Sequence, residues 1–114
     1  MIYRRSIQLA VDIRKQVKRW KAFDQNTIGS QLVRAAESVP SNIAEGYGRF
    51  SHGDQRRFAH VARGSLYEVR TQLVLALEGE LLDEETGERL LDEAEQILKM
   101  TIAYCKSLPK RSYE

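Results

Sequence analysis

Three arginines spaced seven residues apart are the clearest candidates for chemistry in this chain. Arg56, Arg63 and Arg70 fall within one predicted helix, where two turns return each side chain to nearly the same face over a length of about 21 Å. A guanidinium group stays charged at all physiological pH values and can bind one phosphate through two parallel hydrogen bonds. The spacing therefore predicts an outward basic stripe that contacts nucleic-acid phosphates and gains affinity from counterion release.

A second basic stripe is predicted near the N-terminus from Arg14, Lys18 and Lys21, and Arg49 is a further candidate for phosphate contact. Residues 1–70 hold 13 Lys and Arg against 6 Asp and Glu, whereas residues 71–114 hold 5 against 10. The net charge of +2 thus combines a basic first part with an acidic last part. A row of basic residues is also common on ordinary solvated helices, so this simpler interpretation stays open.

The arginines have another possible partner, because the last predicted helix is acidic. Its carboxylates could pair with the arginine stripe of a neighbouring subunit and help to close a ring, and they include Glu84, Glu88, Asp92 and Glu95. Aromatic residues that could stack on bases are few, since Trp20 and Phe58 are predicted to be core residues. Sequence-specific recognition of bases is therefore not expected.

Three kinds of helical enzyme have residue requirements that this chain does not meet. A ferritin-like metal site needs Glu-x-x-His pairs, and neither His52 nor His60 follows a glutamate at that distance. All-α pyrophosphohydrolases use two acidic motifs, but Glu85-x-x-Glu88 occurs once. A HEPN-type ribonuclease, kept as the least favoured alternative, places Arg and His five or six positions apart, whereas Arg56 and His60 are closer. No catalytic residue, metal or cofactor is predicted.

Apolar residues recur at intervals of three and four, which predicts helices throughout a single domain. The expected helices run from about Tyr3 to Lys21, from about Ile28 to Gly48, from a cap at Ser51 or Asp54 to Glu78, and from the turn ending at Gly87 to Pro109. Residues 23–27 are expected to break the pattern and to cap the second helix. The segment Lys110 to Glu114 is expected to be frayed. Four amphipathic helices with short connections predict an up-down-up-down antiparallel bundle.

Two segments contain residues that favour a structural role. Pro40 should kink the second helix because proline lacks an N–H group, and Asn42 and Glu45 could satisfy nearby backbone groups before Gly46 helps to end the helix. Gly64, beside Ser65, costs helix stability, which predicts the close approach of another helix.

The cysteine count and hydropathy predict a protein of the cytoplasm. Cys105 has no second cysteine with which to form an internal disulfide, which favours a reducing compartment. The N-terminal residues make a poor signal peptide, and no segment approaches the roughly 20 apolar residues that span a bilayer. No membrane association is expected.

The motif SVPSNIAEGYGR at residues 38–49, together with Phe58, ARGSL at residues 62–66 and Glu68, resembles one family over essentially the whole chain. It is similar to the four-helix-bundle proteins encoded in intervening sequences of large-subunit ribosomal RNA genes. That family is itself similar to the accessory variability determinant proteins that accompany reverse transcriptases in diversity-generating retroelements. One departure is a shorter connection between the first two helices, where only Phe23 and Ile28-Gly29 remain of a longer family loop.

The resemblance implies a ring-shaped homopentamer that associates with nucleic acid and has no established catalytic activity. It also marks Pro40, Asn42, Glu45, Gly46, Gly64 and Ser65 as positions that define the fold. With the basic stripes, it favours a non-enzymatic, oligomeric protein that binds RNA or DNA, with RNA preferred. The alternative is a structural ring that binds a protein partner, such as a reverse transcriptase or another nucleic-acid enzyme.

Overall fold

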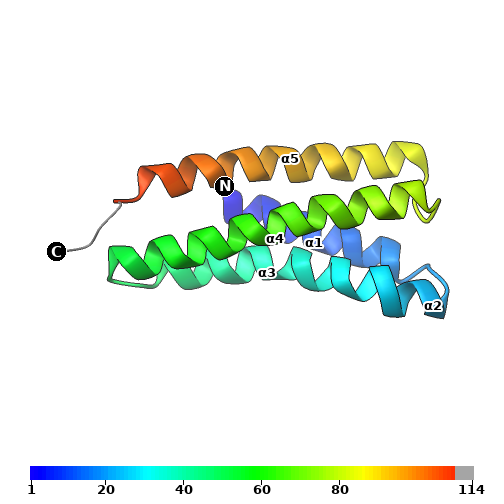
Figure 1. Ribbon diagram of the computed structural model, residues 1–114, viewed down its shortest axis with the longest axis horizontal. Helices are drawn as coiled ribbons and strands as arrows, with labels where there is room; N and C mark the ends of the chain where they lie inside the picture. The colour runs from blue at the N-terminus through cyan, green and yellow to red at the C-terminus, as the bar shows by residue number, and fades with distance from the viewer. Residues whose placement is uncertain (110–114) are drawn as a thin grey trace.

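The chain folds into four long helices around one core in the computed structural model, which describes residues 1–109. The helices are α1 (Ile2–Val17), α3 (Ser30–Tyr47), α4 (His52–Glu78) and α5 (Glu84–Ser107), and the short α2 (Ala22–Asp24) and π-helical turn η1 (Gln25–Gly29) precede α3. Each long helix packs on the next, and α5 returns to α1 (Figure 1). The predicted up-down-up-down four-helix bundle is confirmed.

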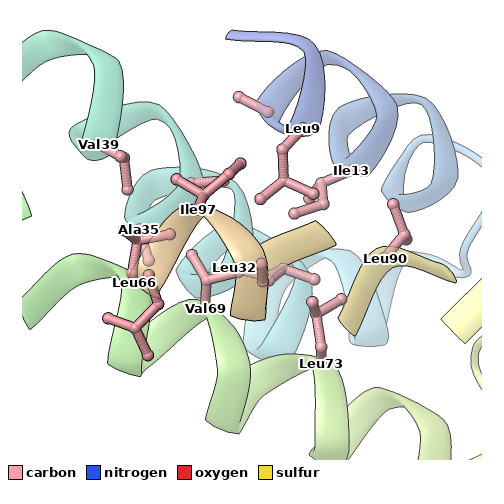
Figure 2. Close-up of a cluster of buried hydrophobic side chains, with 14 of the residues drawn as sticks. Leu9, Ile13, Leu32, Ala35, Val39, Leu66, Val69, Leu73, Leu90 and Ile97 are labelled. Atoms are coloured by element: carbon pink, nitrogen blue, oxygen red, sulfur yellow. The ribbon is translucent and has the colours of Figure 1, made fainter. Parts of the chain in front are cut away.

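Apolar stripes from all four helices meet along the axis of the bundle (Figure 2). Ile13, Leu73 and Ile97 have no exposed surface, and burying a side chain of this size contributes about 1.5–3 kcal/mol. The core also contains small residues such as Ala35 and Ala62, beside which neighbouring helices can approach closely. The core therefore fixes which side of each helix faces solvent.

The first helix ends at Val17, four residues before its predicted end at Lys21. The N–H of Arg19 bonds the carbonyl three residues back, which tightens the last turn. The side-chain amide of Gln25 then donates to the carbonyl oxygens of Val17 and Lys18, each at 3.1 Å. These bonds satisfy carbonyls that a helix end leaves free, so the chain can turn early.

Residues 23–27 were expected to break the helical pattern, but this prediction is wrong. The segment forms α2 and most of η1, and η1 leads directly into α3 at Ser30, near the start predicted at Ile28. The hydroxyl of Thr27 does not cap an N-terminus; it donates to the carbonyl of Phe23 at 2.8 Å, within the helical segment. The short connection is therefore almost entirely helical.

The helix α3 continues through Pro40 to Tyr47, which confirms that the second helix does not end at the proline. Close to the proline, the side-chain amide of Asn42 donates to the carbonyl oxygen of Ser38 at 2.8 Å and to its hydroxyl at 3.0 Å. The same hydroxyl lies 2.8 Å from that of Ser65, so one small polar network joins α3 to α4.

Two glycines of the predicted structural set have opposite surroundings. Gly46 is buried, and a Cβ atom there would lie 3.2 Å from the Cβ of Phe58, so α3 and α4 approach closely at this point. Gly64 is exposed, and a Cβ atom there would meet nothing within 4 Å. The prediction that another helix of the chain packs on Gly64 is therefore wrong.

The ends of α4 and α5 follow the sequence signals. The Ser51 hydroxyl accepts the N–H of Asp54, which confirms one of the two predicted caps, and the Asp83 carboxylate accepts the N–H of Thr86. The helix α5 ends at Ser107, two residues before Pro109. The predicted fraying of Lys110 to Glu114 concerns residues outside the described part of the chain.

The helix α1 is the shortest of the four and covers only part of the bundle (Figure 1). At 1.5 Å per residue it is about 24 Å long, whereas α4 is about 40 Å long. It lies beside the first part of α3 and the α4–α5 turn. The opposite end, which we call the three-helix end, consists of the last turns of α3, the first turns of α4 and the last turns of α5.

Gly64 of α4 is exposed and Gly87 of α5 is buried, so that replacing each by alanine gives a matched test of the helix packing. We expect Gly64→Ala to raise the free energy of unfolding by roughly 0.5–1 kcal/mol, because alanine favours the helix and finds open space. In Gly87→Ala, the new Cβ would overlap the side chain of Leu77, and overpacking should lower stability by about 1–3 kcal/mol. Urea unfolding of both variants measures the difference, and equal effects would contradict the helix packing described.

Candidate nucleic-acid interface

A basic groove lies between α4 and α5 at the three-helix end. It has a volume of about 230 Å³ and is lined by Arg56, His60 and Arg63 of α4 and by Cys105, Lys106 and Leu108 of α5. Among the described residues, no Asp or Glu lines it. The groove thus brings two of the predicted stripe arginines together with a histidine and a lysine, a set of donors suited to phosphate.

The third arginine of the stripe, Arg70, pairs with a carboxylate of the same chain. Arg70 donates to the carboxylate of Glu95 on α5 at 2.9 Å, and its guanidinium also lies 5.0 Å from the ring centre of Tyr67. A seven-residue repeat turns by about 20° per step around an α-helix, so Arg70 points about 40° away from Arg56, here onto α5. The prediction of a stripe of three free arginines is wrong for Arg70, and its partner is in the same chain.

The charge of α5 changes along its length and explains why the groove is basic. Acidic residues are frequent from Glu84 to Glu95, but residues 96–109 contain none. Because α4 and α5 are antiparallel and Arg70 meets Glu95, the earlier arginines of α4 lie beside this later part of α5. Arg56 and Arg63 therefore face Lys106 rather than a carboxylate.

The groove changes the protonation of its own residues. The pKa of His60 is lowered, first by burial and then by the charges of Arg63 and Arg56. The pKa of Cys105 is raised by burial, although the same two arginines oppose this shift. At neutral pH the imidazole is therefore mostly neutral and the thiol stays protonated. A phosphate that neutralises the arginines would make a proton on His60 more favourable.

Arg49 lies at the same end of the bundle but is already partly engaged. Its guanidinium donates to Glu45 at 2.6 Å and stacks on the ring of Phe58, with 4.9 Å between the guanidinium carbon and the ring centre. Arg57 stacks on the same ring at 4.8 Å. Phe58 was predicted to be core, but it is only partly buried and packs against both arginines.

The second predicted stripe is separate from the groove and is shorter than expected. Arg14 pairs with Glu37 of α3 at 2.6 Å, and Lys21 lies beyond the end of α1. Lys18 is exposed beside Arg14. Since α1 and α4 occupy opposite corners of the bundle, the structure does not bring the two basic stripes onto one surface.

An apolar groove lies next to this second stripe, between α1 and α3. It has a volume of about 640 Å³, and its lining includes Tyr3, Ile7 and Val11 on α1 and Pro40 and Ala44 on α3. The three α1 side chains are 40–45% exposed although they are apolar. Exposed apolar patches of this kind often mark contacts with other proteins.

Sequence reasoning missed several residues of the three-helix end. The sequence did not indicate a role for Lys106, for Arg57 or for Phe50, which is fully exposed. One available signal was the absence of acidic residues from residue 96 to residue 109, which indicates where an arginine on α4 would lack a carboxylate partner.

The described part of the chain contains no helix long and apolar enough to cross a membrane. It also contains no group of three or more Asp, Glu, His or Cys side chains placed to hold a metal ion.

Comparison of the sequence with models of known protein families shows which family the chain belongs to. The model of the 23S rRNA-intervening sequence protein family matches residues 1–103. The chain belongs to this family. A crystal structure of an S23 ribosomal protein family member of unknown function from Bacteroides thetaiotaomicron is similar to this intervening-sequence protein, with a TM-score of 0.84. The two are 23% identical, and the match covers 94% of this chain and 100% of the other. The comparison with curated proteins finds no match.

The His60 site of this intervening-sequence protein makes a pH-dependent prediction. In an NMR titration, the His60 ring should lose its proton at a midpoint below 6.5, and Arg63→Gln should raise that midpoint because it removes a nearby positive charge. Arg4→Gln, an exposed control on α1, should leave it unchanged. A His60 midpoint above 6.5, or one insensitive to Arg63, would show that the groove is not the electropositive site described.

Proposed function

We propose that this protein binds nucleic acid through the basic groove at the three-helix end and does not catalyse a reaction on it. The observation that carries the proposal is the convergence of Arg56, Arg63 and Lys106 around His60 with no lining carboxylate among the described residues. In most other places the structure pairs its arginines, as Arg70 with Glu95 illustrates. A groove left unneutralised by the fold is suited to an external anion.

Phosphate is the anion that fits this set of donors best. Arginine can present two N–H groups to two phosphate oxygens, and the lysine ammonium adds a compact positive charge. Three cations in one small groove can contact only a few phosphates. For a single strand, each contact contributes a slope of about −0.7 in a plot of log affinity against log salt, so the expected total is about −2.

RNA is the preferred ligand in this proposal. The family takes its name from intervening sequences of 23S rRNA, which supports a role beside RNA. The contacts described here are to phosphate, which RNA and DNA share, so the groove itself supports binding to either. Binding should therefore depend weakly on base sequence.

A ribonuclease activity is the less favoured alternative for the same groove. His60 could exchange a proton near neutral pH, but Arg56 precedes it by four residues, not by the five or six of a HEPN-type pair. The raised pKa of Cys105 keeps its thiol protonated, which makes it a poor nucleophile. RNA that stays intact during prolonged incubation with the protein, and equally with His60→Ala, supports binding without catalysis.

Charge reversal in the groove tests the proposed function. We expect Arg63→Glu to weaken RNA binding on the order of tenfold or more and to reduce its dependence on salt, because it removes one phosphate contact and adds repulsion. Arg4→Glu makes the same change in net charge on an exposed part of α1 and serves as the control. Gel shifts at several salt concentrations measure both variants. Equal losses in the two variants would indicate a general charge effect and would contradict a localised site.

The apolar groove between α1 and α3 favours a second, assembly function. We propose that a second copy of the chain covers Ile7 and Val11, as in a closed homo-oligomer such as the pentamer implied by the family resemblance. A ring needs two different complementary surfaces on each protomer. The outer face of α4 can supply the other, because Val61 and Leu75 are apolar and are 45% and 47% exposed.

Sedimentation of groove variants tests this assembly. Ile7→Glu should shift the protein toward a monomer, because it places a charge in the apolar contact, whereas Gln8→Glu adds the same charge one residue away and should preserve the oligomer. If both variants keep the wild-type mass, a second copy does not occupy the groove. Loss of binding to a protein partner, such as a reverse transcriptase, would then identify the groove as a site for that partner instead.

A further inference from the structure

The connection between α3 and α4 exposes an aromatic ring that the fold does not use. Phe50 lies between the end of α3 at Tyr47 and the start of α4 at His52, and its side chain is as exposed as in a free peptide. Phenylalanine in this position gains nothing from burial within the chain. The ring is therefore available to a ligand.

Arginines occur on both sides of this ring along the sequence. Arg49 precedes it, and Arg57 follows in the second turn of α4, and the two guanidinium groups stack on Phe58 at 4.9 and 4.8 Å. Their carboxylate partners are Glu45 for Arg49 and Asp54 for Arg57, the latter at 3.3 Å. The end of the bundle thus presents two guanidinium groups stacked on the ring of Phe58, and the connection that leads into α4 carries the exposed ring of Phe50.

The basic groove belongs to the same end. Arg56 is four residues into α4, about 6 Å along the axis from its first residue. The α3–α4 connection and the C-terminal end of α5, which carries Lys106, lie together at the end of the bundle farthest from α2 (Figure 1). A nucleic-acid strand that enters the groove therefore passes close to Phe50.

We propose that the ligand of this surface is single-stranded nucleic acid, with Phe50 stacking on an unpaired base while Arg56, Arg63 and Lys106 hold adjacent phosphates. This inference rests on the proposed function and specifies its ligand. Stacking on aromatic rings and on guanidinium planes requires bases that are not already paired and stacked in a duplex. The occupant we infer is nucleic acid rather than an apolar protein segment, because the groove at this end of the bundle is lined by Arg56, Arg63 and Lys106 and by no carboxylate among the described residues.

The chain supplies a matched control for this ring. Phe23 is also highly exposed, at 76%, but it lies in α2 at the opposite end of the bundle. Phe23→Ala and Phe50→Ala therefore remove the same exposed ring from the two ends of one molecule. Because both side chains are exposed, neither change should reduce thermal stability, and melting temperatures check that both variants fold.

The experiment measures the affinity of the full chain for a labelled oligouridine of about 12 nucleotides, a length within the usual range of single-strand sites, and for its duplex with oligoadenosine. We expect tighter binding to the single strand and a loss on the order of tenfold in Phe50→Ala, with little change in Phe23→Ala and recovery in Phe50→Trp. In Phe50→Trp, stacking should also change the tryptophan fluorescence on binding, whereas Trp20 of the wild type lies beyond the end of α1, near the opposite end of the bundle.

The outcomes distinguish phosphate binding in the basic groove from base stacking on Phe50. Absence of binding to both nucleic acids would overturn the proposed function and, with it, the stacking role. Binding that is equal for strand and duplex, or unchanged in Phe50→Ala, would overturn the stacking role and leave phosphate binding intact. Sedimentation of Phe50→Ala decides the remaining case, because a loss of oligomeric mass would assign Phe50 to a contact between subunits and would contradict a nucleic-acid platform.

Discussion

The buried face of α4 is the constraint on which the rest of the structure depends. Ala62, Leu66 and Val69 are held in the core, and the geometry of the helix then decides where every other α4 side chain points. Arg56 and Arg63 are placed at the edge that faces the last turns of α5. The basic groove is thus a consequence of core packing, and its arginines need no local scaffold of their own.

The distribution of charge along α5 divides α4 into two functional parts. Where α5 is acidic, it neutralises the arginine that reaches it and stabilises the bundle through the Arg70–Glu95 pair. Where the acidic residues stop, Arg56 and Arg63 line a groove that contains no carboxylate among the described residues. The short α1 has a related effect, because it leaves the three-helix end without a fourth layer. There Tyr47 of α3 meets Tyr104 of α5, with ring centres 5.9 Å apart and nearly perpendicular planes. The Arg70–Glu95 ion pair and the basic groove thus lie at different positions along the same two helices.

The sequence predicted the fold well because the signals involved are local and periodic. The apolar periodicity and the Ser51 cap located α4, and the helix through Pro40 was expected to continue. The predictions that failed depend on contacts between distant residues. The early end of α1 is stabilised by Gln25, and the open surroundings of Gly64 depend on where other helices lie. Neither can be obtained from the residues of one helix.

The candidate site was predicted in part, for the same reason. Spacing placed Arg56 and Arg63 on one face, but the small rotation of a seven-residue repeat brought Arg70 to Glu95, and Lys106 entered only through the antiparallel pairing with α5. Phe58 was predicted to be a core residue from its helical position, whereas in the structure the guanidinium groups of Arg49 and Arg57 stack on its ring. The site can be identified only when it is known which helices are neighbours and how their residues are aligned along the bundle.

The central claim is that nucleic acid meets this protein at the three-helix end, and mapping the contact surface tests it most directly. In a titration of the isotopically labelled protein with oligouridine, followed by amide NMR spectra, we expect the largest changes from about residue 48 to residue 64 and in the last two turns of α5. Amides of α1 around Arg14 and Lys18 should change little. Changes centred on α1, or spread evenly over all four helices, would contradict the account.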